Sequence, residues 1–324
     1  MTVHAPFAED LAIGVPLDAA PDITIDAGLA AQYLAITGDQ LRLALSDPLS
    51  AQVTGRDTRL ANPGLVIGLS IGQSTVATRR VIANLMYRNL TLSRPVHVGE
   101  TIRTIVTPLE ASWTRSGTER AKVLLNMHVT TSDGDEIATY QRLALLAVAE
   151  ARRLKVTEPT AVGVEPNLLH YATCVPGGWQ HPLGQVARPL AAGDAWDDPL
   201  VDTVSSAREL VRLTQNLAAA HRDARAGIDG RRLVYGGHTV SLAQASLSRL
   251  LPDLLTVLAW RSCDHLAPVF EDDLLAFTVR IDDVRESRGF RLADATVTAT
   301  AWRPGATAVL QWRPVLLLAG TDAS

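Results

Sequence analysis

Two short stretches in the second half of the chain hold the residues whose types and spacing suit acid–base chemistry. The stretch V-R-L-T-Q-N-L-A-A-A-H-R-D places Asn216 and His221 five residues apart. The later stretch L-V-Y-G-G-H-T puts Gly236 and Gly237 at the start of an apolar helical pattern. A histidine can act as a general acid or base near neutral pH. An asparagine cannot take a proton, but it can hold a water or orient the imidazole.

The glycine pair adds a second function to this site. The first N–H groups of a helix have no acceptor within the helix, and the helix dipole also favours an anion there. The amides of Gly236 and Gly237 could therefore stabilise negative charge on a substrate oxygen, and glycine allows the substrate to approach closely. Structural alternatives stay open. His221 could be a hydrogen-bonded loop histidine, the glycines could only allow helix–sheet contact, and Asn216 could mark a decayed site.

A repeated pattern of elements would position these residues. Residues 24–39 are expected to form a short helix, residues 61–76 a buried helix that is apolar nearly all round, and alternating strands follow. After a proline-punctuated stretch, the same order of short helix, apolar helix and strands returns. The spacing from Gly64 to Pro95 is 31 residues, and the spacing from Gly237 to Pro268 is the same. One helix-then-strands unit therefore occurs twice, which favours an α+β layered fold.

Composition excludes several classes of function. The chain has 324 residues, 47% hydrophobic and 20% charged, which fits a globular protein of one or two domains. The net charge of -4 does not favour nucleic-acid binding. No signal-peptide pattern and no membrane-spanning apolar run is found. Cys174 and Cys263 lie far apart in no metal-binding spacing, so we expect reduced thiols in a cytoplasmic protein, with no metal and no cofactor.

The two stretches resemble the motifs of the MaoC-like, or hydratase 2, double-hot-dog enzymes. That group carries L-T-G-D-x-N-P-h-H-x-D, where h is apolar, and this chain matches it at Leu213, Thr214, His221 and Asp223. A second element of the group, h-h-H-G, is similar to L-V-Y-G-G here, with Tyr235 in place of the histidine. The runs N-P-G-L-V-I-G-L-S-I-G-Q-S-T-V and R-S-C-D-H-L-A-P-V are similar to acyl dehydratases related to mesaconyl-CoA (β-methylmalyl-CoA) hydratase.

The resemblance implies a fold and a division of the chain. A hot-dog unit is a curved antiparallel sheet wrapped round one long helix, and the α+β double hot-dog contains two such units. We expect an N-terminal unit over residues 1–151, a crossover linker over 152–200 and a C-terminal unit over 201–324 that carries the active site. Both central helices should be buried, and the two sheets should join edge to edge.

The chain also departs from the family pattern at the positions that carry its chemistry. Asn216 stands where the family has its catalytic aspartate, and Gln215 replaces the preceding glycine. The first half keeps T-G-D, ending at Asp39, but has Ala44 where the histidine would fall. Neither half therefore contains the complete aspartate–histidine pair. Asp39 could face His221 across the seam between the halves, or it could be a solvated carboxylate in a turn.

Further residues are candidates for substrate binding. Tyr235, together with Asp264 and His265 in a predicted strand, could line the acyl pocket, although Asp264 and His265 could equally be a structural pair. A CoA substrate carries phosphates, which basic side chains bind. Three arginines lie near the site in sequence and are candidates for this role, namely Arg231, Arg232 and Arg261. A dicarboxylic acyl group would need one more arginine, which the sequence does not identify.

The resemblance implies a hydro-lyase that reversibly hydrates an α,β-unsaturated acyl thioester of the enoyl-CoA type, branched or dicarboxylic acyl groups such as mesaconyl-CoA included. The expected substrate is attached to CoA or to an acyl-carrier protein, and a homodimer is one open alternative for assembly. The rival hypothesis is a non-catalytic thioester-binding or assembly subunit with a decayed site. A hot-dog thioesterase is a third alternative.

Overall fold

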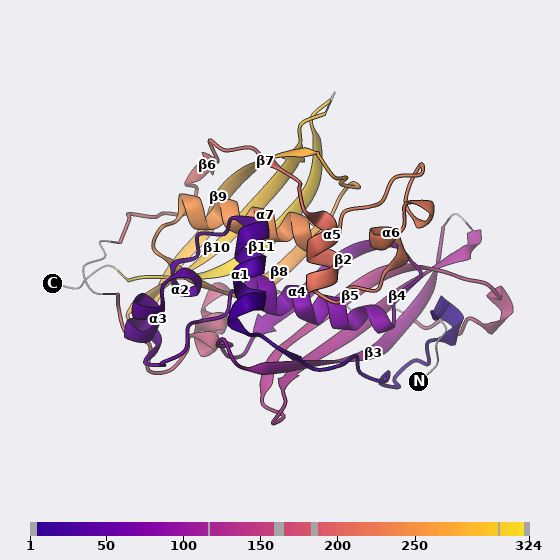
Figure 1. Cartoon of the computed structure of the whole chain (residues 1–324), viewed down its shortest axis with the longest axis horizontal. Helices are drawn as coiled ribbons and strands as arrows, with labels where there is room; N and C mark the ends of the chain where they lie inside the picture. Colours follow the sequence, from indigo (N-terminus) through magenta and orange to yellow (C-terminus); the bar gives the residue numbers. More distant parts are fainter. Residues whose placement is uncertain (1–4, 116, 159–164, 183–186, 304, 321–324) are drawn as a thin grey trace.

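One antiparallel sheet of eleven strands runs through the part of the chain that the structure describes, residues 5–115, 117–158, 165–182, 187–303 and 305–320 (Figure 1). The structure is a computed structural model. The strand order is β1-β3-β4-β5-β2-β8-β11-β10-β9-β6, and β7 also pairs with β9. The strands of the first half are β1 Ile23–Thr24, β2 Val81–Leu92, β3 Thr101–Thr114, β4 Gly117–Thr131 and β5 Glu136–Ala147. Those that follow are β6 Ala195–Asp197, β7 Asp202–Thr203, β8 Leu254–His265, β9 Leu274–Ser287, β10 Phe290–Ala301 and β11 Thr307–Leu318.

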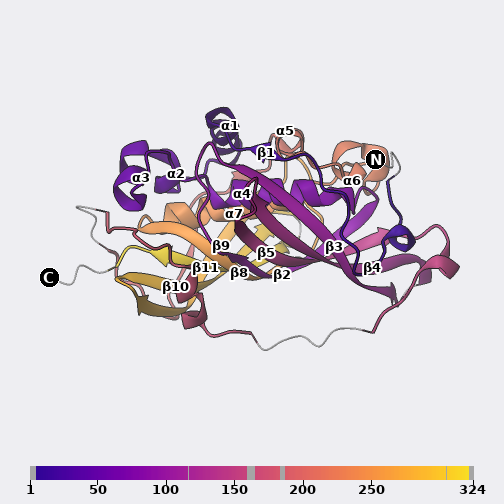
Figure 2. The ribbon, with the colours of Figure 1, turned by 90° about the horizontal axis from the view of Figure 1, so that it is seen from below.

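The helices gather on one face of this sheet (Figure 2). They are α1 Ala27–Thr37, α2 Arg42–Leu45, α3 Asp47–Thr54, α4 Pro63–Gln73, α5 Ala207–Leu213, α6 Ala219–Arg222 and α7 Gly236–Leu250. Every residue of α4 is buried, as its sequence predicts, because leucine, isoleucine and glycine occur all round it. Most of α7 is buried too. The two central helices contact each other, so the burial predicted for both is confirmed.

The two halves of the sheet join edge to edge, as predicted, through an antiparallel pairing of β2 with β8. Tyr87 lies opposite Cys263, and Leu90 lies opposite Trp260. Each half therefore contributes one central helix and one set of strands. This arrangement is an α+β double hot-dog. The same junction brings residues from both halves to one seam.

The repeated motif folds in the same way in both halves. The Thr37 hydroxyl donates to the Tyr33 carbonyl at 2.9 Å, and the Thr214 hydroxyl donates to the Leu210 carbonyl at 2.8 Å. Two residues further on, each motif closes a turn on its own side chain. Asp39 Oδ1 accepts the N–H of Leu41 at 2.9 Å, and Asn216 Oδ1 accepts the N–H of Ala218 at 3.0 Å. The turn needs only a side-chain oxygen, so aspartate and asparagine build it equally well.

The helix starts differ from one another. Asp26 caps α1, because its carboxylate accepts the N–H of Leu29 at 2.7 Å. The S-x-x-E spacing of Ser206 and Glu209 favours a capping box in the sequence, but this expectation is wrong. Ser206 has a left-handed backbone with φ of 58° and its side chain caps nothing. Glu271 instead accepts the N–H of Ala207 at 3.2 Å, so a distant side chain replaces the local cap.

The stretch predicted as a crossover linker, residues 152–200, is described in part. Residues 159–164 and 183–186 lie outside the described residues. The short helix Leu168–Cys174 packs beneath the C-terminal strands, in a second apolar cluster that includes Leu255, Phe290 and Leu317. Strand β6, near the end of the stretch, pairs with β9. The three-part division of the chain stays a prediction.

Candidate active site at the seam between the halves

A cavity of about 260 Å³ lies between the two halves of the molecule. Strands β2 and β5 supply its lining from the first half, and α6, the start of α7 and the end of β8 supply it from the second half. Its polar lining consists of Asn84, Tyr87, Arg142, His221, Tyr235, Thr239 and His265, and its apolar lining includes Val81, Ile82, Leu85, Leu233, Val234, Leu266 and Val269. A mostly apolar cavity with a few polar groups is the usual form of a small-molecule site.

His221 lies on α6, a helix that the first half holds in place. The N–H of Ala219 donates to the Arg79 carbonyl at 3.0 Å, and the N–H of Leu217 donates to the Thr75 hydroxyl at 2.9 Å. His221 Nδ1 lies 3.1 Å from the Leu233 carbonyl oxygen. Because a carbonyl only accepts, neutral His221 carries its proton on Nδ1, and this leaves the Nε2 lone pair free to act as a base.

The electrostatic surroundings keep this imidazole neutral. Burial lowers the pKa of His221 to about 4; the hydrogen bond to Leu233 acts against that shift, and the positive charge of Arg142 adds to it. Burial also lowers the pKa of His265 to about 4, with Arg142 and His221 as lesser causes. Both cavity histidines are therefore uncharged at neutral pH, and both can accept a proton.

The start of α7 brings Gly236 against the ring of His265. A Cβ atom on Gly236 would lie 2.6 Å from His265 Cε1, so a side chain here would displace the histidine. Gly236 lines the cavity, whereas Gly237 is buried beside the Tyr235 ring and does not line it. The Tyr235 hydroxyl donates to the Gly68 carbonyl at 3.2 Å. Among the described residues, neither glycine N–H has a hydrogen-bond acceptor, so the helix start can offer its amides to an oxygen.

Asn216 is buried, with 1% of its surface exposed, and is not among the residues that line the cavity. Its side-chain oxygen closes the turn at Ala218, and its backbone carbonyl accepts from Arg222 Nε at 2.6 Å. Thr214, in the same turn, packs so tightly on α4 that a Cβ on Gly72 would lie 1.6 Å from the Thr214 carbonyl oxygen. Asn216 thus positions the segment that leads to His221.

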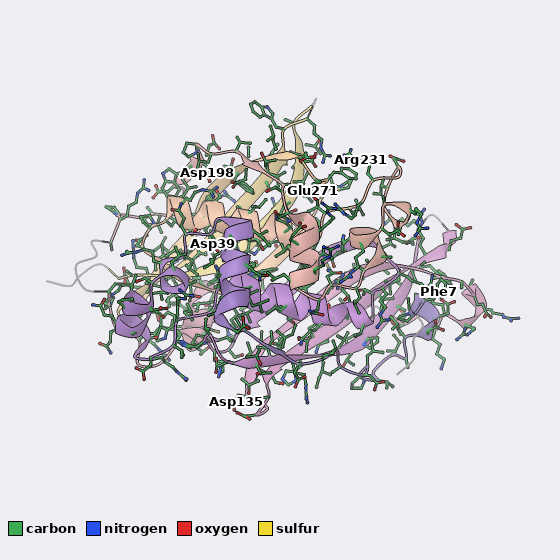
Figure 3. The ribbon with its side chains drawn as sticks, in the orientation of Figure 1. Phe7, Asp39, Asp135, Asp198, Arg231 and Glu271 are labelled. Atoms are coloured by element: carbon green, nitrogen blue, oxygen red, sulfur yellow. The ribbon has the colours of Figure 1, made fainter. Side chains whose placement is uncertain are left out.

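Asp39 crosses the seam but meets α7 instead of His221. Its two carboxylate oxygens accept four hydrogen bonds, from Leu41 N, Ser248 Oγ, Asn62 Nδ2 and Gln244 Nε2, at 2.9, 2.8, 2.7 and 2.6 Å. The carboxylate is 3% exposed, so it is neither solvated nor part of the cavity lining. In Figure 3, Asp39 lies beside α1, well apart from Arg231 and Glu271.

The other sequence candidates fall into two groups. Arg261 pairs with Asp294 at 2.6 Å, Arg232 with Glu271 at 3.2 Å, and Asp264 with Arg88 at 2.6 Å, so each charge already has a protein partner and none lines the cavity. Arg231 is exposed, and its guanidinium lies 3.9 Å from the centroid of the Phe270 ring. No carboxylate among the described residues forms an ion pair with Arg231, which leaves it available for a phosphate.

The sequence reasoning missed four polar residues of the cavity: Asn84, Tyr87 and Arg142 from the first half, and Thr239 from the second. Arg142 lies on β5 between Tyr140 and Ala144 on the inward face of the strand, where the residues are otherwise apolar. A charged residue at an inward position of an alternating strand is a signal that could have identified it, because such charges are costly to bury. Asn84 lies on the neighbouring strand β2.

No family-level sequence model matches the chain. The mesaconyl-CoA hydratase of Cereibacter sphaeroides is 25% identical over 296 residues, which cover 87% of this chain and 84% of that protein. The beta-methylmalyl-CoA dehydratase of Chloroflexus aurantiacus is 26% identical over 287 residues, covering 83% and 80%. Two solved structures match nearly end to end. A double-hot-dog protein from Mycobacterium tuberculosis is 35% identical with a TM-score of 0.81, covering 98% of this chain and 99% of that one. A MaoC domain protein from Chloroflexus aurantiacus is 21% identical with a TM-score of 0.84, covering 99% of both chains.

The chain belongs to the MaoC-like double hot-dog family. The two relatives with named activities are a hydratase and a dehydratase of CoA thioesters. No helix in the described part of this MaoC-like protein is both long and apolar enough to cross a membrane.

Proposed function

We propose that this MaoC-like protein is a hydro-lyase that reversibly adds water to an α,β-unsaturated acyl-CoA thioester. One observation carries the proposal. His221, whose Nδ1 lies against the Leu233 carbonyl, lines a cavity that Gly236, the first residue of α7, also lines. A base for water and a donor for the thioester oxygen thus share one site. The similarity to the mesaconyl-CoA hydratase supports the same reaction class, with a branched or dicarboxylic acyl group as the expected substrate.

In the proposed reaction, His221 transfers both protons. Nε2 takes one proton from a water molecule while the water oxygen bonds to the β carbon. The electrons of the double bond move to the thioester oxygen and form an enolate. The imidazolium then returns its proton to the α carbon, and the thioester carbonyl is restored. Nδ1 keeps its proton throughout and donates it in the hydrogen bond to the Leu233 carbonyl, so the ring keeps its orientation.

The enolate oxygen needs stabilisation at the moment it forms. The N–H of Gly236, at the positive end of the α7 dipole, is the proposed donor, with that of Gly237 as a second candidate. One such donor typically contributes ~3–4 kcal/mol to the barrier. Asn216 acts as a positioning residue, because its turn holds α6. Tyr235 and His265 contact the acyl group, and Arg231 at the surface binds a CoA phosphate.

One observation favours the rival function of a non-catalytic thioester-binding subunit. His221 Nδ1 meets a backbone carbonyl, and no carboxylate among the described residues forms an ion pair with His221. A carboxylate partner would make the imidazole a stronger base.

A direct assay separates the two functions. The purified chain is mixed with crotonyl-CoA or mesaconyl-CoA, and loss of the conjugated thioester is followed by ultraviolet absorbance, with the hydrated product identified by mass spectrometry. The lyase predicts turnover of at least one of these substrates. Tight binding of both thioesters with no product would refute the lyase and support the binding subunit.

A further inference from the structure

Arg142 is a buried positive charge without a negative partner. It is 3% exposed, and no carboxylate oxygen among the described residues lies within 4.0 Å of its guanidinium nitrogens. Among the described residues, the other two buried arginines each form an ion pair: Arg261 with Asp294, and Arg291 with Asp253. Removing an ion from water costs several kcal/mol unless a counter-charge compensates it. The buried charge of Arg142 is therefore costly to the fold unless an anion from outside the chain binds it.

Neutral oxygens hold the guanidinium in one orientation. Arg142 Nε donates to Asn84 Oδ1 at 2.6 Å, and Nη1 donates to the Ser74 hydroxyl at 3.0 Å. Nη2 has no hydrogen-bond partner among the described residues, and Arg142 lines the cavity. The guanidinium is thus fixed by two of its nitrogens and has its third free.

Asn84 provides a second free donor beside it. Arginine can only donate, so the Asn84 atom that accepts from Arg142 must be the amide oxygen. The Nδ2 group is then a donor, and it is buried without a hydrogen-bond acceptor. Asn84 also lines the cavity. Two unsatisfied donors, one of them charged, match the two oxygens of a carboxylate.

We propose that Arg142 and Asn84 bind a carboxylate group carried by the acyl part of the substrate, which makes the substrate a dicarboxylic acyl thioester. The proposal rests on the proposed function for the thioester chemistry. The donors come from β5 and β2 of the first half, whereas His221 and Gly236 come from the second half. A substrate that spans the seam would have its carboxylate on one half and its reacting carbons on the other.

The position of Arg142 argues against a CoA phosphate as its ligand. Phosphates belong to the part of CoA that remains near the surface, whereas the Arg142 side chain is almost wholly enclosed. The positive charge of Arg142 also lowers the pKa of both His221 and His265. A bound carboxylate would offset this effect and make His221 a better base with the correct substrate bound.

The test compares a dicarboxylic substrate with a neutral one. In Arg142→Met, kcat/KM for mesaconyl-CoA should fall at least about 100-fold, the loss expected of a charge-assisted pair. For crotonyl-CoA, which lacks the second carboxylate, it should change less than about threefold. Arg88→Met is the matched control, because Arg88 lies on β2 outside the cavity lining and pairs with Asp264. Arg88→Met should leave the ratio of kcat/KM for mesaconyl-CoA to kcat/KM for crotonyl-CoA unchanged.

A second variant keeps the test informative if Arg142→Met does not fold. Asn84→Asp supplies the missing counter-ion next to Arg142, so the fold should be retained while a substrate carboxylate is repelled. It should lower kcat/KM for mesaconyl-CoA and spare crotonyl-CoA. Equal losses on both substrates in the two variants would overturn the proposal, because Arg142 would then act on the thioester itself. If the wild type turns over neither substrate, the proposed function fails, and calorimetric binding of the two thioesters to wild type and Arg142→Met decides the carboxylate site separately.

Discussion

Replacing the proposed base removes proton transfer while leaving the fold nearly intact. In His221→Gln, loss of a single acid–base group should lower kcat about 10²–10⁴-fold, which is about 2.7–5.4 kcal/mol on the barrier. The same substitution loses one hydrogen bond, from Nδ1 to Leu233, which contributes only about 1 kcal/mol to stability. Turnover of mesaconyl-CoA or crotonyl-CoA and urea unfolding measure the two effects independently.

The pH profile provides a second readout of the same residue. The base must be neutral to act, and the pKa of His221 lies at about 4 because of burial. Wild-type kcat/KM should therefore be level at neutral pH and fall only as the pH drops through about 4. That acid limb should be absent from the residual activity of His221→Gln.

His170→Gln is the matched control, since His170 is exposed on the short helix Leu168–Cys174, outside the cavity lining. It should leave turnover and its pH profile unchanged. Unaltered turnover in His221→Gln, on a substrate that the wild type hydrates, would refute the assignment of His221 as the proton-transfer group.

Three further predictions follow from the buried polar residues. Asp39→Asn places an amide opposite the donors of Asn62 and Gln244, so the free energy of unfolding in urea should fall by about 2–4 kcal/mol. Turnover per folded molecule should persist. Loss of turnover with unchanged stability would show that Asp39 takes part in the reaction. Asn216→Asp keeps the oxygen that closes the turn, so a folded, active variant is expected; a carboxylate near the imidazole would raise the His221 pKa and move the acid limb of the pH–rate profile upward. Burial lowers the pKa of His238 to about 4, so protonation of the unfolded chain should reduce stability by about 3 kcal/mol as the pH falls from about 6.5 to 4. In His238→Leu, the free energy of unfolding measured in urea should no longer show that loss as the pH falls. An unchanged pH dependence of stability would contradict this role of His238.

Local patterns were enough to predict the elements that carry the site. The apolar sequence of α4 and the glycine pair at the start of α7 predicted two central helices, and both are buried. These predictions succeeded because helix burial depends on residues close together in sequence. The capping box at Ser206 failed because a distant side chain, Glu271, provides the acceptor instead.

The roles within the site could not be read from the motif alone. T-G-D and T-Q-N are different motifs by chemistry, yet both close the same turn, because the turn uses only one side-chain oxygen. The two motifs differ in the residues that contact their side chains. Asp39 is saturated by four donors, two of which come from α7 side chains more than two hundred residues away. No spacing rule within one half could anticipate those partners.

The sequence by itself determined the repeated unit, the two buried helices and the placement of His221 a short distance before a helix start. These properties depend on local periodicity and backbone preference. Only the tertiary structure decided which polar groups share the cavity. The pairing of β2 with β8 brings Arg142 and Asn84 of the first half to the seam that contains His221 and Gly236 of the second. Such contacts join residues that the sequence separates widely, and they follow from the register of one strand pair, which a single sequence does not encode in any short pattern.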